Sequence, residues 1–527
     1  MDDDDELTAE ITAQVDSWST NSNTALHLSL HTPTTTLATF HPEFTYSIFG
    51  EEEAIFGYRG LKISIRFAAH DLRPRVSIEY GQKFEETLGQ DGEVKATDVK
   101  AALSDFLPEA AFEEGALKWG DEKAFRPPGE KTKEYTRDGV QHEIWCSSLA
   151  DADARRVLQN MQILVPLFIE GGSILQLEHD WSTQRWKLFL LYRLDGNPRP
   201  QASPYSLVGF GTSYRVSNLP GKDPSREDLD AYTFTHESLE ALLPSPDATD
   251  ESMLDTNHSP LDLPSRERLS QFLILPPYQG TGHGQQLYNN MYTHLISDPN
   301  VHEFTVEDPN EAFDDLRDLC DLRHLRKHVP EFSALRVTTT LTQQDLDPLK
   351  NIPTALIVSG PTRAAIQKKT KLASRQFGRL VEMHTLSFIP PSHRSRSRIT
   401  RKLKCSNEND KAYYLWRLFV KERLYLHNRD LLAQVERSER VERLEGAVDG
   451  VLEGYVALLE RVDGDKGLTD AAEGDDEVVE GAAQGRRQKK RRTVVNDEED
   501  EDGDEDDVNA EKVEVAKQKG RKKVRTG

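Results

Sequence analysis

Two short stretches carry the residues best suited to chemistry: a glycine-rich turn and, further along the chain, a pair of adjacent carboxylates. The turn has the sequence QGTGHG at 279–284, and the carboxylates are Glu307 and Asp308. Glycine permits positive φ and leaves backbone N–H groups bare. Bare amides at the start of a helix bind phosphate, and a partly buried carboxylate can act as a base. The turn therefore predicts a phosphate-bearing ligand, and the two carboxylates are candidates for acid–base chemistry.

The glycine spacing does not match two common nucleotide-binding motifs. A Walker loop has Lys-Ser/Thr after its last glycine, whereas Gln285 and Gln286 follow here. A dinucleotide fingerprint has the pattern G-x-G-x-x-G, whereas this turn has Q-x-x-G-x-G. The turn still favours a phosphate-bearing ligand, but one of neither class. The alternative is a turn that serves only helix packing.

The elements around the turn position both stretches. The apolar run at 272–275 predicts a buried strand, which Pro276-Pro277 ends because neither proline can donate to a sheet ladder. Apolar residues recur at helical spacing from Gly284 onward, which predicts an amphipathic helix that begins at the turn. The run 301–306 predicts a second strand, so the carboxylates lie at the carboxyl end of a strand, where open α/β sheets bind ligands. Adjacent side chains diverge there, and we expect Glu307 to face the ligand.

Four segments carry a resemblance to a known family. They are LILPPYQGTGHGQQLY (273–288), TVEDPNEAFDDLRD (305–318), FHPEFTYSIFGEEEAIFGYRGLKI (40–63) and FIEGGS (168–173). In these segments the chain resembles the catalytic subunits of type B histone acetyltransferases, which belong to the GNAT superfamily of N-acetyltransferases. The resemblance covers roughly residues 20–321, with gaps.

The resemblance implies acetyl-CoA as co-substrate and a histone lysine as acceptor. It places the general base at Glu307, with Asp308 and Glu170 assisting. It implies cofactor contacts at Phe272, Leu273, Ile274, Gln279, Gly280, Thr281, Gly282, His283, Gly284, Gln285, Asn310 and Phe313. The thioester carbonyl must be polarised as the oxyanion forms, and we expect the donor to be a backbone N–H freed where the strand at 273–275 splays from its neighbour.

An acidic loop and two aromatic residues are candidates for binding a basic peptide. The resemblance places a histone-contacting acidic patch at Glu51, Glu52 and Glu53, and an ordinary solvated charge run is the alternative. Trp186 and Tyr214 are candidates to line the peptide groove, because aromatic rings suit the stem and charged head of lysine. Core packing is the alternative for both.

The cysteines and His283 are not expected to take part in the chemistry directly. Cys320 is typical of a core thiol, so we expect direct attack in a ternary complex and no acetyl-cysteine intermediate. His283 is expected to have a positioning or packing role. The three cysteines lie far apart, which indicates reduced thiols in cytoplasm or nucleus. No His/Cys/Asp cluster has metal-ligand spacing, so no metal is expected.

Composition points to a basic partner. The 527 residues carry a formal net charge of -24, which argues against direct DNA binding and favours a histone tail. Hydrophobic residues make up 36% of the chain and the mean hydropathy is -0.65, as expected when solvated segments dilute a normal core. No apolar run approaches the length of a membrane span, so no membrane association is expected.

The predicted fold class is α/β, a GNAT acyltransferase fold in which helices flank a mixed sheet, with a small, mainly β N-terminal domain and a helical C-terminal region. The predicted parts are a flexible N-terminus (1–23), a histone-binding domain (24–150), a catalytic domain (151–328) with a disordered insertion (217–267), a helical domain (329–463) and a disordered charged tail with basic clusters (464–527).

The function expected from these features is acetylation of the N-terminal tail of newly synthesised histone H4, linked to histone deposition. Histones H3–H4 and a WD-repeat β-propeller subunit are the partners that the resemblance implies, in cytoplasm and nucleus. Two alternatives remain: a GNAT enzyme that acts on another amine, and a noncatalytic acidic histone chaperone.

Overall fold

The computed structural model describes residues 15–85, 95–177, 180–199, 201–217, 261–340, 352–399 and 407–464. It is a mixture of sheets and helices, which confirms the predicted α/β class. Among these residues no helix is both long and apolar enough to cross a bilayer. The predicted charged tail lies outside the described residues, apart from Gly464 at the end of the last helix.

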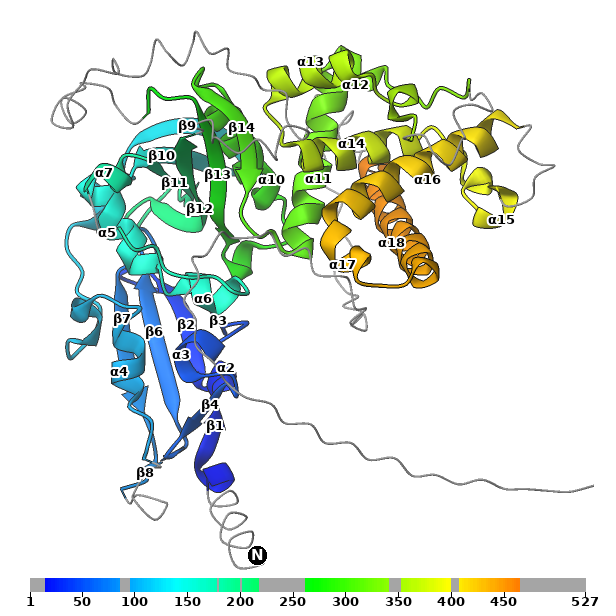
Figure 1. Cartoon of the computed structure of the whole chain (residues 1–527). Coiled ribbons are helices and arrows are strands. Elements are labelled where there is room, and N and C mark those ends of the chain that lie inside the picture. Colours follow the sequence, from blue (N-terminus) through cyan, green and yellow to red (C-terminus); the bar gives the residue numbers. More distant parts are fainter. Residues whose placement is uncertain are drawn as a thin grey trace, which may run out of the picture. The chain divides into compact units, whose positions relative to one another are not determined.

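A six-stranded sheet forms the centre of the chain (Figure 1). Its strand order is β14-β13-β12-β11-β10-β9, and only the β13–β14 pair is parallel. The strands are β9 (Glu130–Arg137), β10 (Val140–Ser148), β11 (Trp186–Leu194), β12 (Tyr205–Ser217), β13 (Ser265–Ile274) and β14 (Val301–Val306).

Two predicted boundaries are wrong. The sheet includes β9 and β10, so the boundary at 150/151 cuts through it; strand pairing with β11 and burial of Ile144 place these strands in the core of the central sheet. The predicted insertion at 217–267 is also too long, because Ser217 pairs with Ser265 and Glu267 is fully buried in β13. Residues 218–260 lie outside the described part of the chain.

Helices cover both faces of this sheet. One face packs against α10 (His283–Ile296) and α11 (Glu311–His328) through Leu191, Leu269 and Phe304. The other face packs against α5 (Ala152–Met161) and α6 (Leu164–Phe168) through side chains that include Leu188, Phe210 and Leu273. The two faces therefore belong to two separate apolar clusters.

The N-terminal region is mainly β, as its alternating sequence predicts. Its four-stranded sheet has the order β3-β2-β6-β7. The strands are β2 (Leu26–His31), β3 (Thr36–Phe40), β6 (Lys62–Ala68) and β7 (Pro74–Glu79), and β5 (Tyr58–Arg59) pairs with β8 (Gln82–Lys83). The short helices of this region are α2 (Ser22–Ala25), α3 (Tyr46–Phe49) and α4 (Val99–Ser104); α7 (Asp180–Thr183) comes later, just before β11.

The predicted flexible N-terminus ends earlier than residue 23. β1 (Ser19–Asn21) pairs with β4 (Ala54–Phe56), and Asn21 caps α2 by accepting from the backbone N–H of Thr24. The polar sequence concealed this strand because its partner is more than thirty residues away, as the pairing of Thr20 with Ile55 shows. Local periodicity cannot report such a partner.

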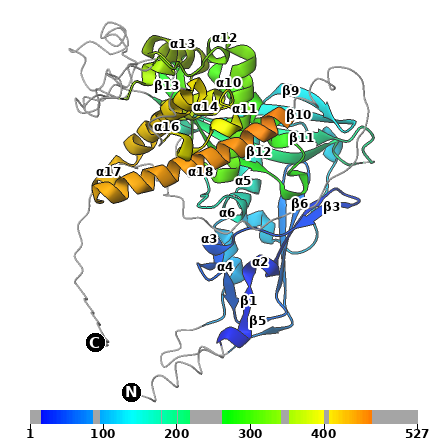
Figure 2. The ribbon, with the colours of Figure 1, turned by 90° about the vertical axis from the view of Figure 1, so that its right-hand side faces the viewer.

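The C-terminal region is helical, as predicted. It contains α12 (Pro330–Ser333), α13 (Gly360–Thr370), α14 (Ser374–Leu386), α15 (Arg396–Ile399), α16 (Glu408–His427), α17 (Arg429–Ala433) and α18 (Arg437–Gly464). Figure 2 shows α18, in orange, beside α16, and both helices belong to the apolar cluster of α10 and α11. These helices therefore extend the core of the central sheet.

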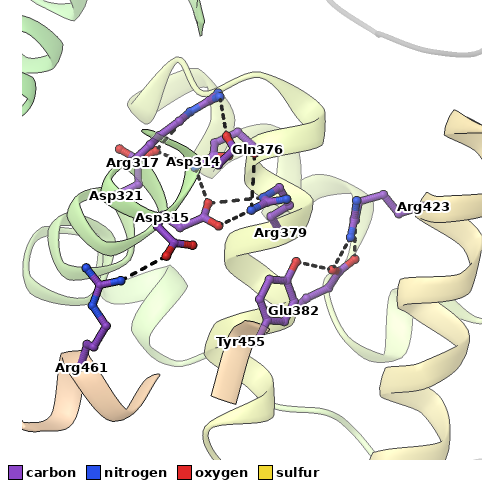
Figure 3. Close-up of polar contacts among 11 residues, drawn as sticks. Asp314, Asp315, Arg317, Asp321, Gln376, Arg379, Glu382, Arg423, Tyr455 and Arg461 are labelled. Atoms are coloured by element: carbon purple, nitrogen blue, oxygen red, sulfur yellow. Dashed lines mark hydrogen bonds and ion pairs between the residues drawn. The ribbon is translucent and has the colours of Figure 1, made fainter. Parts of the chain in front are cut away.

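Buried ion pairs join α11 to the C-terminal helices (Figure 3). Asp318 on α11 is fully buried and pairs with Arg379 on α14 at 2.5 Å. Glu382 on α14 is also fully buried and pairs with Arg423 on α16 at 2.8 Å. Each buried charge thus has a partner of opposite charge, as low-dielectric surroundings require. Burial raises the pKa of Asp321, in the same network, to about 6.

Candidate active site

The glycine turn gives α10 an open N-terminus. After β13, residues Pro276–Tyr278 form a short 3-10 turn, and Gly280 and Gly282 then have φ values of +76° and +80°. Gly282 is the N-cap of α10, and no side chain caps the helix. This position favours glycine because of its φ, and a Cβ here would lie 2.5 Å from Nη1 of Arg137 and would displace that side chain. The amides of the first helical turn are left for another acceptor.

The third glycine has a different role. A Cβ on Gly284 would lie 3.3 Å from Cδ2 of Leu316 on α11, so Gly284 lets the two helices pack closely. Helix packing was the alternative to phosphate binding for the whole turn. It explains why residue 284 is a glycine. Two polar side chains bond to nearby carbonyls: Gln279 Nε2 donates to Ile274 at 2.9 Å, and Thr281 Oγ1 donates to Tyr278 at 2.7 Å.

The side chain of His283 packs beneath the turn. Its Nδ1 lies 2.7 Å from the hydroxyl of Tyr135, and its ring lies 4.5 Å from that of His142. Burial lowers the pKa of His283 to about 4, so the ring is neutral at pH 7. Any cofactor contact of this residue therefore falls to its backbone.

The edge of β13 opens where β14 ends. Parallel pairing stops at Leu269 and Val306, after which the N–H of Glu307 donates to the carbonyl of Leu269 at 2.9 Å. β13 continues to Ile274 paired with β12 alone. Because backbone groups alternate in direction along a strand, the main chain of Phe272 and Ile274 faces the side that β14 has left.

This geometry corrects the predicted position of the oxyanion donor. The N–H of Leu275 donates to the carbonyl of Val208 at 2.9 Å, and Leu273 pairs with Phe210. The splay therefore separates β13 from β14 and begins after Leu269, before the prolines. Leu273 and Ile274 have buried side chains, so only their backbone can reach a ligand.

Phe313 and Asn310 lie at the start of α11. The Phe313 ring meets Phe272 edge-on at 5.0 Å. The side chain of Asn310 caps the helix by accepting from the N–H of Phe313 at 2.9 Å, so its oxygen is already bonded. Gln285, in the first turn of α10, accepts from Arg323 at 3.3 Å.

Glu307 is half-buried among polar side chains from neighbouring strands. Ser270 Oγ donates to its Oε2 at 2.5 Å, and the hydroxyl of Tyr214 donates to its Oε1 at 3.2 Å. Burial raises the pKa of Tyr214, so its hydroxyl keeps the proton that it donates. Arg268 Nη1 lies 3.9 Å from Oε1, and the Trp186 ring lies 4.6 Å from that of Tyr214. Three residues predicted from separate segments thus lie together.

The other two predicted carboxylates are exposed. Asp308 follows Glu307 with a φ of +31°, which turns the chain after β14. Glu170 lies just after α6, and two bonds hold the loop that follows it. The N–H of Gly171 donates to the hydroxyl of Tyr46 at 2.6 Å, and Gln271 Nε2 donates to the carbonyl of Ser173 at 2.9 Å.

Comparison with known proteins gives one consistent result. A family model described as the histone acetyl transferase HAT1 N-terminus matches residues 18–170. The histone acetyltransferase type B catalytic subunit of Aspergillus oryzae is 39% identical over 465 residues, which cover 84% of this chain and 86% of the relative. The same subunit of Gibberella zeae is 38% identical over 467 residues (85% and 91%), and that of Candida albicans is 30% identical over 470 residues (88% and 94%). The chain belongs to the family of type B histone acetyltransferase catalytic subunits. It is a histone acetyltransferase.

The acidic loop of this acetyltransferase does not present all three of its carboxylates. Glu53 has a φ of +48°, and its carboxylate accepts from the N–H of Thr45 and from Asn23 Nδ2, each at 2.7 Å. This carboxylate is thus bonded inside the loop. Glu51 and Glu52 are exposed.

Sequence reasoning missed four polar residues of the acetyltransferase site. Ser270 and Arg268 contact the Glu307 and Tyr214 pair, Gln271 holds the loop after Glu170, and Arg137 covers Gly282. One signal was present: Arg268 and Ser270 flank Leu269 just before the apolar run at 272–275. Arg137 gave no signal, because only the fold brings β9 to the turn. In the described ranges no three His, Cys, Asp or Glu residues are grouped to hold a metal.

Proposed function

We propose that this enzyme transfers the acetyl group of acetyl-CoA to lysine side chains in the N-terminal tail of newly synthesised histone H4. The observation that carries the proposal is the position of Glu307. Its carboxylate lies at the end of β14, where β13 loses its parallel neighbour, and the glycine turn follows at the end of the same β13 strand.

The residues present fit acetyl-CoA, which supplies the acetyl thioester when it is bound. The uncapped N-terminus of α10 offers amides to a diphosphate, with positive φ at Gly280 and Gly282. An extended ligand can hydrogen-bond to the open backbone edge at Phe272 and Ile274, as a neighbouring strand would. The Phe272 and Phe313 rings offer an apolar surface beside this edge. We also propose that the catalytic domain has the GNAT fold that the sequence predicts.

Proton removal is the task of Glu307. Free lysine has a pKa of about 10.4, so the amine arrives protonated at pH 7. The Glu307 carboxylate takes that proton, directly or through a water, and the neutral amine attacks the thioester carbonyl. The C–S bond then breaks, and CoA leaves as a thiolate that takes up the proton lost by the new amide nitrogen. The backbone N–H of Phe272 or Ile274 is placed to donate to the oxyanion that forms. The exposed Glu170 and Asp308 are suited to lead protons to solvent.

Direct attack is favoured over an acetyl-cysteine intermediate. Cys320 is only 3% exposed, and burial raises the pKa of its thiol far above neutrality. Burial likewise raises the pKa of Cys146 to about 12. Neither thiol is poised to be a thiolate nucleophile at neutral pH.

The proposal includes a setting for the reaction. The acidic chain, with exposed Glu51 and Glu52 and with Trp186 beside Tyr214, suits a lysine-rich tail. Histones H3–H4 and a WD-repeat β-propeller subunit are the proposed partners. We propose that the enzyme acts in the cytoplasm and the nucleus, before the histones are deposited into chromatin.

Mass spectrometry of histone H4 incubated with purified enzyme and acetyl-CoA tests this function. The expected result is acetyl groups confined to tail lysines, with little product from an equal concentration of spermidine or a blocked-lysine peptide. Equal acetylation of spermidine would favour an enzyme for another amine. H4 binding without any acetyl transfer would favour a histone chaperone.

A further inference from the structure

A bulge in β13 lies between the two segments that carry the proposed catalytic carboxylates. Gly211 pairs with Phe272 and Ser213 pairs with Leu269, so Thr212 on β12 faces two residues of β13. Those two residues are Ser270 and Gln271. The N–H of Gln271 donates to Thr212 Oγ1 at 3.1 Å, which replaces the ladder bond lost at the bulge.

The bulge turns two consecutive side chains to one face of the sheet. Leu269 and Phe272 both pack in the cluster of α10 and α11, although three positions separate them. Without the extra residue, strand alternation would place them on opposite faces. Ser270 and Gln271 lie between them, and both contact groups on the opposite face, where α5 and α6 pack.

Each of the two side chains holds a different carboxylate-bearing segment. Ser270 Oγ donates to Glu307 Oε2 at 2.5 Å. Gln271, which is 4% exposed, donates to the carbonyl of Ser173 at 2.9 Å, three residues after Glu170. Gln162 supports the same loop by accepting from the N–H of Leu175 at 2.6 Å.

We propose that Ser270 and Gln271 are positioning residues for acetyl transfer: Ser270 fixes the Glu307 carboxylate, and Gln271 fixes the loop that follows Glu170. The inference rests on the proposed function, because it assigns a task to residues beside the proposed base. The bulge thereby contacts two segments whose carboxylates, Glu170 and Glu307, are 137 positions apart in the sequence numbering. A glutamate side chain has several rotatable bonds, and a donor on each oxygen holds it in one orientation.

Ser270→Ala is the first variant that tests the proposal. We expect kcat on an H4 tail peptide to fall roughly tenfold to a hundredfold, the cost of a misplaced catalytic group, with KM for acetyl-CoA unchanged. The acid limb of the pH–rate profile should move to higher pH, because the ionised carboxylate loses a donor. Ser270→Thr keeps the hydroxyl and should restore most of kcat.

Two further readouts separate positioning from a structural role. The defect should shrink as the pH approaches about 10, where the lysine loses its proton unaided. Ser270→Ala should also add little to Glu307→Gln, and Gln271→Leu should add little to Glu170→Gln. Ser77→Ala is the matched control, because it removes a serine–glutamate bond, to Glu79 at 3.2 Å, on β7. This control should leave the kinetics unchanged.

The proposal is overturned if Ser270→Ala keeps kcat within about twofold and an unmoved acid limb, or if its full defect persists in the Glu307→Gln background. If the alanine variant fails to bind acetyl-CoA by calorimetry, Ser270→Cys, close in size but a weak donor, takes its place with the same expectation. Glu307→Gln at full activity would instead contradict the proposed base, so the two failures are distinguishable.

Discussion

The two faces of β13 differ in what holds them together. Leu269, Phe272 and Ile274 lie in the apolar cluster under α10 and α11, beside the glycine turn. Arg268, Ser270 and Gln271 lie on the other face and bond to Tyr214, Glu307 and Ser173. Near Glu307 the first face is apolar, whereas the second face, which is apolar at Leu273, carries polar contacts between distant segments. We propose that the first face and its turn bind the cofactor and that the second face carries out proton transfer.

The largest effect is expected on the polar face, from Glu307→Gln. Loss of the base should lower kcat by roughly a hundredfold to ten-thousandfold at pH 7. The amide is close in size to the carboxylate, so the fold should survive. Steady-state kinetics on the H4 tail peptide from pH 6 to 10 measure the effect. A variant that retained half of the wild-type kcat at pH 7 would break the assignment of proton transfer to this face.

The next effect is expected at the turn, from Gly282→Val. A β-branched residue at φ +80° costs at least about 1–2 kcal/mol, and its Cβ would displace Arg137. The Kd for acetyl-CoA should rise by at least tenfold, or about 1.4 kcal/mol, with a smaller change in kcat at saturation. Gly280→Ala is the matched control, because φ is also positive but nothing lies within 4 Å of its Cβ. Equal effects of the two variants would remove any special role for Gly282.

A smaller effect is expected on stability, from Asp321→Asn beneath the cofactor-binding face. Burial raises the pKa of Asp321 from 3.8 to about 6, so folding favours its protonated form. The wild type should therefore lose stability as the pH rises from 4 to 7, by at most about 3 kcal/mol. The asparagine variant lacks this loss, and its stability relative to the wild type should increase over the same range. Urea denaturation at several pH values measures the difference, and a constant difference would contradict the raised pKa.

The smallest effect is expected from Cys320→Ala. The thiol is buried on α11 and has no proposed part in the chemistry. The variant should lose a little stability because it packs less well, but its activity per folded molecule should stay within about twofold of wild type. An acetylated Cys320 trapped in the absence of histone would contradict direct attack.

The same contrast explains what the sequence alone could predict. The helix after the turn and the strand at 301–306 were predicted within a few residues, because short-range apolar spacing determines them. The strand predicted at 272–275 is only the end of β13, which begins at Ser265. The helical C-terminal region was predicted for the same reason. Glu307, Tyr214 and Trp186 were named separately, and the structure places them in contact.

The remaining features depend on long-range partners. The extent of the catalytic sheet was missed because β9 and β10 are defined by their pairing with β11. The internal role of Glu53 follows from Thr45 and Asn23, which no local pattern connects to it. The bulge at Ser270 and Gln271 is a register shift against β12 and has no local signature in the sequence.

Calorimetric titration of acetyl-CoA into the wild type, Gly282→Val and Glu307→Gln, with turnover measured on the same samples, tests the division of labour most directly. The account predicts that the wild type and Glu307→Gln bind with equal affinity while only the wild type turns over at full rate. It predicts weak binding for Gly282→Val. Absence of binding heat in the wild type, or loss of binding together with turnover in Glu307→Gln, would contradict it.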